Sequence, residues 1–196
     1  SSWIFRPHLP NKVAFLLKPD QAVAWRGPLV SSALKQFISD VSWGDLDYLI
    51  VDMPPGTGDV HLTLLQTTPL TGVVVVTTPQ EVALADAQKA VAMLSMIPVK
   101  IPVLGVVENM SWFTPIELPD NKYLIFGEGG GQKLADYCSS PLLTQVPLYM
   151  DIMNGGDTGI PAALRANTPY GKIYGQMAQA VAQQVAILNG VVAQSS

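Results

Sequence analysis

The chain has 196 residues, of which 48% are apolar and 13% are charged, and its 11 basic and 15 acidic residues give a net charge of −4. This length fits one compact domain, and the composition excludes a coiled coil and intrinsic disorder. The acidic balance indicates neither nucleic acid nor a membrane as a partner, and a single cysteine is typical of a cytoplasmic protein without disulfides.

Short runs rich in valine, isoleucine and leucine alternate with helical patterns along the chain. We expect strands at Val13–Leu17, Tyr48–Val51, Gly72–Thr77, Val103–Glu108 and Leu142–Val146. Such alternation is typical of βα units. It predicts an α/β fold with a mainly parallel sheet and helices on both faces.

Three helices carry signals at their ends. Apolar residues at helical spacing predict a crossover helix over Pro28–Ser39. The sequence Thr78-Pro-Gln-Glu81 resembles a capping box, with Thr78 as N-cap of a helix that reaches about Met96. Thr168-Pro169 predicts the start of a last helix, which packs on the sheet and ends at Gly190.

Asp52 lies at the carboxyl end of the second expected strand, before a turn rich in proline and glycine. Ligands of open α/β sheets bind at that edge. In nucleoside triphosphatases such an aspartate holds magnesium or its bound water, and a nearby glycine N–H approaches the γ-phosphate. Asp52 and Gly56 suit these catalytic and metal-binding roles. Alternatively, Asp52 only caps the helix that begins near Asp59.

Several motifs in order resemble those of the Mrp-type iron–sulfur cluster carriers, which belong with the MinD and ParA ATPases in the deviant P-loop class. They are Trp25–Pro28, Asp47–Asp59, Val74–Gln80, Gly105–Met110 and Ile125–Gly127, within a region from about residue 13 to 189. The resemblance implies a P-loop NTPase fold, with ATP and magnesium as cofactors. It also implies a homodimer that closes across ATP and passes iron–sulfur clusters to apoproteins.

The resemblance also assigns roles to residues outside the Asp52 turn. It implies that Asn109 faces the nucleotide base. The residues alone, without the resemblance, fit an asparagine in a turn equally well. More weakly, it places Pro147–Asp151 beside the same base. Arg26 suits a contact with phosphates or a partner subunit, or a solvated turn. We expect His8 and His61 to lie on the surface.

The phosphate-binding loop of the family is absent from this chain. Gly127–Gly131 looks superficially similar, but Glu128 would repel phosphate and no serine or threonine follows Lys133. We interpret this run as a loop before a helix. The resemblance then implies that roughly the first hundred residues of the full protein are missing, that the chain alone is inactive as an ATPase, and that one sheet edge is uncovered.

The ligands of a bridging cluster are equally hard to find. Many family members have a Cys-x-x-Cys pair after the Glu-Asn-Met motif, but the loop Ser111–Tyr123 has no cysteine. Cys138 would give a symmetric dimer only two thiolates, and we expect it to be a buried structural thiol. The cluster ligands are therefore unknown. The long irregular stretch Ser111–Gly131 is of a kind that is often functional.

The sequence predicts one domain with short extensions. Residues 1–12 form an irregular or non-native N-terminus, 13–190 the C-terminal part of the Mrp-like NTPase domain, and 191–196 a tail. Two alternatives stay open: a non-catalytic dimer or interaction module from a degenerate copy, and a ParA- or MinD-like positioning ATPase. The acidic balance and the lack of a basic amphipathic tail disfavour the second.

Overall fold

The structure is a computed structural model that describes residues 32, 36, 38–53, 59–98, 100–115 and 117–194. Its sheet contains strands β1 (Val73–Thr77), β2 (Val103–Phe113) and β3 (Leu142–Leu148) in the order β1-β2-β3. Both pairings are parallel. The three strands match runs expected from the sequence, and β2 extends five residues beyond the expected Glu108.

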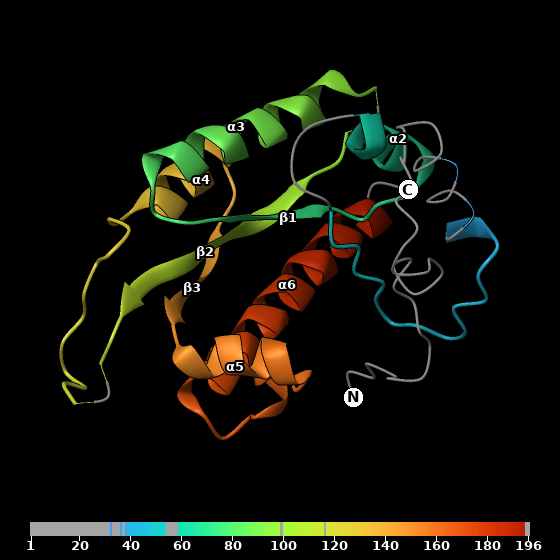
Figure 1. Cartoon of the computed structure of the whole chain (residues 1–196). Coiled ribbons are helices and arrows are strands. Elements are labelled where there is room, and N and C mark those ends of the chain that lie inside the picture. The colour runs from blue at the N-terminus through green and yellow to red at the C-terminus, as the bar shows by residue number, and fades with distance from the viewer. Residues whose placement is uncertain are drawn as a thin grey trace, which may run out of the picture.

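The helices in this part of the chain are α2 (Asp59–Thr67), α3 (Glu81–Met96), α4 (Gly130–Cys138), α5 (Met150–Thr158), the short 3-10 helix η2 (Ala162–Leu164) and α6 (Pro169–Gln194). Helices α3 and α4 contact each other and the sheet, while α6 contacts β2 and β3. Figure 1 shows α3 and α4 on one face and α5 and α6 on the other. The predicted α/β fold, with a parallel sheet and helices on both faces, is thus confirmed.

Two clusters of buried side chains hold these layers together. The larger fills the space between the sheet and helices α3 and α4, with Val106 and Leu134 fully buried at its centre. The smaller joins α2 to the end of α3 through Leu65 and Met93. Residues of β1 and β2 pack in these clusters and helices lie on both faces of the sheet, which explains why these strands appear as apolar runs in the sequence.

Helix ends differ from the expectation at two places. Helix α3 begins after Gln80, whose extended backbone forms the N-cap without a side-chain bond, so the capping box at Thr78 is wrong. Glu81 instead pairs with Lys133 at 2.6 Å. Helix α6 starts at Pro169 as predicted, with a bond from the Gly171 N–H to Thr168 Oγ1, but it continues past Gly190 to Gln194. An interior glycine costs helix stability without ending the helix.

The expected strand over residues 48–51 is wrong as well. These residues are irregular, and Ile50 is 79% exposed. An apolar run becomes a strand only where another strand bonds to its backbone, and no strand among the described residues pairs with this segment. The expected strand at 13–17 and most of the expected helix at 28–39 lie outside the described residues, although 32, 36, 38 and 39 are helical.

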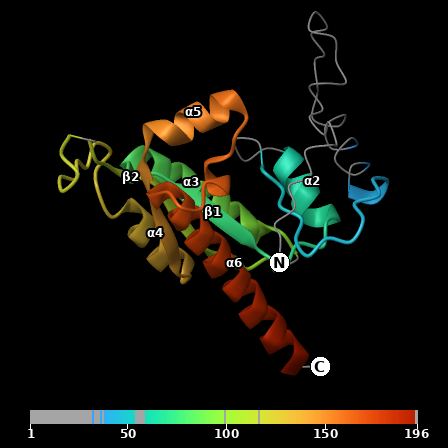
Figure 2. The ribbon, with the colours of Figure 1, turned by 90° about the horizontal axis from the view of Figure 1, so that it is seen from below.

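Strand β1 is an edge strand in the part of the sheet that the structure describes, and Val76 on it is 61% exposed. The expected uncovered edge therefore corresponds to β1 in these residues. Figure 2 shows the same sheet from below, with α6 crossing it. None of the described helices has both the length and the hydropathy required to cross a membrane.

Candidate functional site

The carboxyl ends of β1 and β2 lie side by side at the edge of the sheet. Thr77, the last residue of β1, pairs with Glu108 of β2, and Asn109 follows directly. This edge borders an open hollow of about 340 Å³, lined by Val76, Thr77, Thr78, Ala83, Asp86, Ala87 and Asn109. Parallel α/β sheets bind ligands at this position. The hollow is therefore the candidate functional site.

The lining of the hollow is mostly uncharged. Thr78 Oγ1 is buried and has no hydrogen-bond partner among the described residues, while Thr77 Oγ1 donates to the Thr78 carbonyl at 3.2 Å. Asp86 supplies a carboxylate, which pairs with exposed Lys89 at 3.1 Å. A buried hydroxyl without a partner favours a ligand with a hydrogen-bonding group. The carboxylate disfavours a phosphate in the hollow.

Asn109 lies where the backbone changes direction. The next residue, Met110, has a left-handed φ of 56°, and its N–H donates to Asn109 Oδ1 at 3.0 Å. This bond is the turn role that the sequence left open. It leaves the Nδ2 amide group of Asn109 to donate toward the hollow that the residue lines. Both interpretations of Asn109 are therefore compatible with its geometry.

Glu108, the residue before Asn109, links three elements of the fold. Its side chain is only 1% exposed, and its two carboxylate oxygens accept hydrogen bonds from the Gly131 N–H at 2.6 Å and from Gln145 Nε2 at 2.8 Å. The carboxylate thus joins β2 to α4 and β3. In the sequence, Glu108 stands out only as part of the Gly105–Met110 motif. A charged residue inside an apolar strand, upstream of a glycine run, was the available signal.

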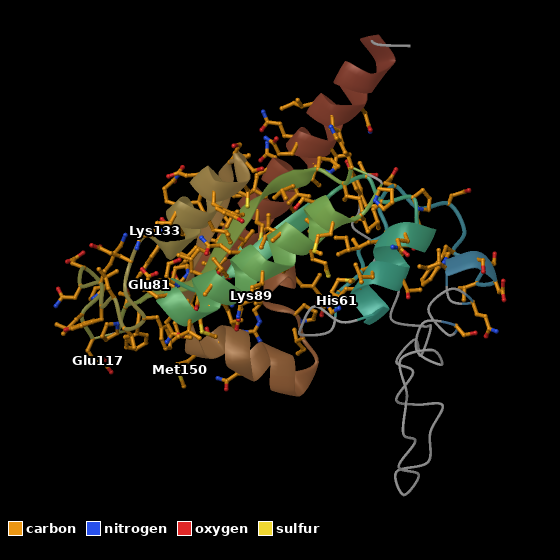
Figure 3. All side chains as sticks on the ribbon, turned by 90° about the horizontal axis from the view of Figure 1, so that it is seen from above. His61, Glu81, Lys89, Glu117, Lys133 and Met150 are labelled. Carbon is orange, nitrogen blue, oxygen red and sulfur yellow. The ribbon has the colours of Figure 1, made fainter. Side chains whose placement is uncertain are left out.

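The glycine run leads into α4, and its last two residues, Gly130 and Gly131, allow close packing. A Cβ on Gly130 would lie 2.6 Å from the Pro79 carbonyl oxygen, and one on Gly131 would lie 2.6 Å from Glu108 Cβ. Lys133 forms a salt bridge with Glu81 (Figure 3). The run is thus a loop followed by a helix, as the sequence predicted, and the lysine that follows it faces a carboxylate.

The structure does not bring Asp52 to the hollow. Asp52 is exposed in an irregular segment and is absent from the lining. Figures 1 and 2 show the segment 40–53 beside α2, away from the end of β1 where α3 begins. Gly56 and Arg26 lie outside the described residues. The roles of Asp52 and Gly56 stay predictions.

Residues 147–151 span the end of β3 and the start of α5, and they contact α6. Tyr170 donates from its hydroxyl to Asp151 Oδ2 at 3.3 Å, and its ring lies 5.5 Å from that of Tyr149 between centroids. Neither Tyr149 nor Asp151 lines the hollow. The expected contact of this segment with a base therefore stays a prediction.

Among the described residues, no three His, Cys, Asp or Glu side chains lie close enough together to hold a metal ion. His61 is 7% exposed, so its expected surface position is wrong; it lies on α2, whose side chains pack toward α3. His8 lies outside the described residues.

Cys138 ends α4 and packs, half-buried, against the larger core cluster. Burial raises the pKa of its thiol above the ordinary value. A thiol that favours its protonated form is a poor cluster ligand, since metals bind the thiolate. This environment fits the expected structural role.

Anaerobic reconstitution of this chain with iron and sulfide should therefore give at most a weak cluster. A dimer would offer two Cys138 thiols where four ligands are normal. Visible absorption spectroscopy measures the cluster, and Cys138→Ala is the variant to compare. A stable four-iron spectrum that this substitution abolishes would contradict the structural assignment.

A parallel sheet with helices on both faces and a hollow at the carboxyl ends of its strands is the architecture of nucleotide-binding α/β proteins. The ParA family, described as NUBPL iron-transfer P-loop NTPases, matches residues 11–182. The chain therefore belongs to this family. The resemblance inferred from the motifs is confirmed.

Curated relatives agree with this assignment. The chain is 52% identical over 149 residues, or 76% of its length, to an iron-sulfur cluster carrier protein from Synechocystis. It is 46% identical over 89% of its length to one from Escherichia coli K12, and 42% identical over 91% to one from Pyrococcus horikoshii. The matches cover 42%, 47% and 59% of those proteins, so the chain spans about half the length of the relatives.

A solved structure is similar too. A nucleotide-binding protein from Archaeoglobus fulgidus, in complex with ADP, superposes with a TM-score of 0.60 at 38% sequence identity. The match covers 67% of this chain and 53% of that one.

Proposed function

We propose that this chain is the C-terminal part of the nucleotide-binding domain of an ATP-dependent carrier that assembles iron–sulfur clusters and transfers them to apoproteins. The observation that carries the proposal is the 46% identity with the Escherichia coli cluster carrier over 89% of this chain. The family description, which names iron transfer and a P-loop NTPase, supports both halves of the proposal.

The base of the nucleotide would occupy the hollow at the ends of β1 and β2. Asn109 and Thr78 offer uncharged hydrogen-bonding groups there, and Ala83 and Ala87 offer apolar walls. The Asp86 carboxylate would keep the phosphates out of the hollow. The similar protein from Archaeoglobus fulgidus, which binds ADP, supports a nucleotide as the ligand.

In the full-length protein, magnesium and the phosphates would meet Asp52 and Gly56, which requires the Asp52 segment to lie beside the hollow, where this structure does not place it. Magnesium is commonly held by one or two carboxylates, with phosphate oxygens and water completing its shell, so the single exposed carboxylate of Asp52 fits this mode of binding. When bound, the ion neutralises charge on the phosphates. Asp52 would orient a bound water through its carboxylate, and the Gly56 N–H would donate to the γ-phosphate.

The cluster would be cargo, with ligands still unknown in this chain. Closure of a homodimer across ATP would couple hydrolysis to holding or releasing it. The partners would be apoproteins that accept the cluster, and neither nucleic acid nor a membrane. The acidic composition and the lone cysteine favour the cytoplasm as the compartment.

In the full-length protein, Asp52→Asn should retain the fold but reduce magnesium-dependent ATP hydrolysis at least about tenfold, because it keeps the size and removes the charge that acts on the metal shell. Phosphate release at saturating ATP is the measurement. Asp45→Asn, also an exposed carboxylate in the same segment, is the matched control and should hydrolyse ATP normally. Wild-type turnover of Asp52→Asn would contradict the assigned role.

A further inference from the structure

The end of β2 and the loop that leads to α4 form a projecting structure, which we call the arm and define as residues 111–115 and 117–128. Figures 1 and 2 both show it extending beyond the end of the sheet. Phe113 and Tyr123 exchange backbone hydrogen bonds of 2.9 and 2.8 Å, and Lys122 Nζ lies 4.3 Å from the centroid of the Trp112 ring. The arm is thus built by its own internal contacts.

Large apolar side chains are exposed on the arm. Leu118, Tyr123, Leu124 and Ile125 are exposed by 44–57%. Single exposed apolar residues are ordinary, but several on one projecting element indicate an interaction site. Self-contained bonding of the arm strengthens this inference, because an ordered element loses little conformational entropy when a partner binds.

The charges around these side chains have one dominant sign. Glu117, Asp120 and Glu128 are exposed on the arm, whereas its ammonium group, on Lys122, lies over the arm's own Trp112. Figure 3 shows Glu117 at the far end of the molecule. A complementary surface would be apolar and bordered by lysine or arginine. A second copy of this chain, with a net charge of −4 and the same acidic arm, fits poorly.

The base of the arm is anchored beside the candidate nucleotide site. Gly130 packs against the backbone of Pro79, and Lys133 pairs with Glu81 at 2.6 Å. Pro79 and Glu81 follow Thr78, which lines the hollow. A protein bound to the arm would therefore lie at the same end of the sheet as the nucleotide.

We propose that the arm docks a partner protein. The partner's docking surface would be an apolar patch bordered by lysine and arginine residues. The inference rests on the proposed function in one respect: the partner would be an apoprotein that receives the cluster. Apolar contacts from Leu118 and Ile125 supply affinity, and Glu117 and Asp120 orient the partner.

Two designed helical peptides with the same leucine face test the proposal, one with lysine and the other with glutamate on its polar face. Fluorescence anisotropy with the 196-residue chain should show binding of the leucine–lysine peptide only. The double variant Leu118→Ser/Ile125→Ser should weaken it at least about tenfold. Leu164→Ser, which removes an equally apolar exposed side chain outside the arm, should leave it unchanged.

A charge-reversal pair tests the acidic border separately. Glu117→Lys/Asp120→Lys should weaken binding of the leucine–lysine peptide about tenfold at low salt and less at high salt, while Asp45→Lys should leave it within about twofold. Equal binding of both peptides, or equal losses in the control variants, would overturn the proposal.

Sedimentation tests the remaining possibility, which is self-association of the chain through the arm. Arm variants should leave the oligomeric state unchanged, and conversion of a dimer to a monomer would overturn the proposal by making the arm a self-association surface. The peptide assay contains neither nucleotide nor cluster. Its failure thus removes the docking role alone, whereas intact peptide binding without any cluster transfer would remove the proposed function.

Discussion

Calorimetric titration of the 196-residue chain with magnesium and ATP should show no tight binding, and the chain should not hydrolyse ATP. Its sequence contains no glycine-rich loop with two lysines. A triphosphate needs a row of backbone N–H groups and a lysine to replace its hydration. The chain's remaining candidate for a phosphate contact, the Asp52 turn, supplies chiefly a carboxylate.

Contacts in the hollow are too weak to replace that loop. A hydrogen bond from Asn109 to a base would contribute about 1 kcal/mol, or roughly tenfold in affinity. The Lys133 ammonium is paired with Glu81, and the glycines before it pack against Pro79 and Glu108. The Lys133 ammonium and these glycines are therefore already used in contacts within the folded chain. A micromolar dissociation constant would contradict this account and would indicate that residues 127–133 bind phosphate.

Gly131→Ala should destabilise the chain by about 1–3 kcal/mol, because the added methyl group overpacks a buried position. The new Cβ would lie 2.6 Å from Glu108 Cβ, which is fixed to strand β2, and 3.0 Å from the Oε2 that accepts the Gly131 N–H. Either α4 moves outward or the hydrogen bond is lost. Urea unfolding followed by circular dichroism measures the change.

Gly175→Ala is the matched control. Gly175 lies within α6, and a Cβ there would meet no atom within 4 Å. The same substitution should stabilise the chain by about 0.5–1 kcal/mol, because alanine favours a helix more than glycine does. If both variants changed stability in the same direction, close packing would not explain the glycine run.

Strands and helices with strong local patterns could be predicted from the sequence. The runs that became β1 and β2 are rich in valine, as expected for strands of a parallel sheet with helices on both faces. Helix α6 begins where Thr168 indicated, since a side-chain cap is a local interaction. These features depend on neighbours within a few residues.

Errors arose where distant contacts decide the structure. Glu81 resembled the last residue of a capping box, but it pairs with Lys133, 52 residues later in the chain. Residues 48–51 have the apolar pattern of a strand, yet a strand also needs a neighbour to bond to its backbone. Neither fact is visible in a local pattern.

The candidate site was predicted in part. Asn109 lies at the edge of the sheet because it directly follows the part of β2 that pairs with β1, and it lines the hollow. Glu108 was missed because its role depends on Gly131 and Gln145, which come together only in the folded chain. Thr78 was assigned to a helix cap and instead lines the hollow with a buried hydroxyl.

Cluster transfer tests the central claim most directly. The full-length protein, loaded anaerobically with an iron–sulfur cluster, would be mixed with a purified apoprotein, and the spectrum of the re-isolated acceptor would be recorded with and without magnesium and ATP. The account predicts that the acceptor gains the cluster and that ATP changes the rate of transfer. A full-length protein that holds no cluster, or an acceptor that stays in the apo form, would contradict it.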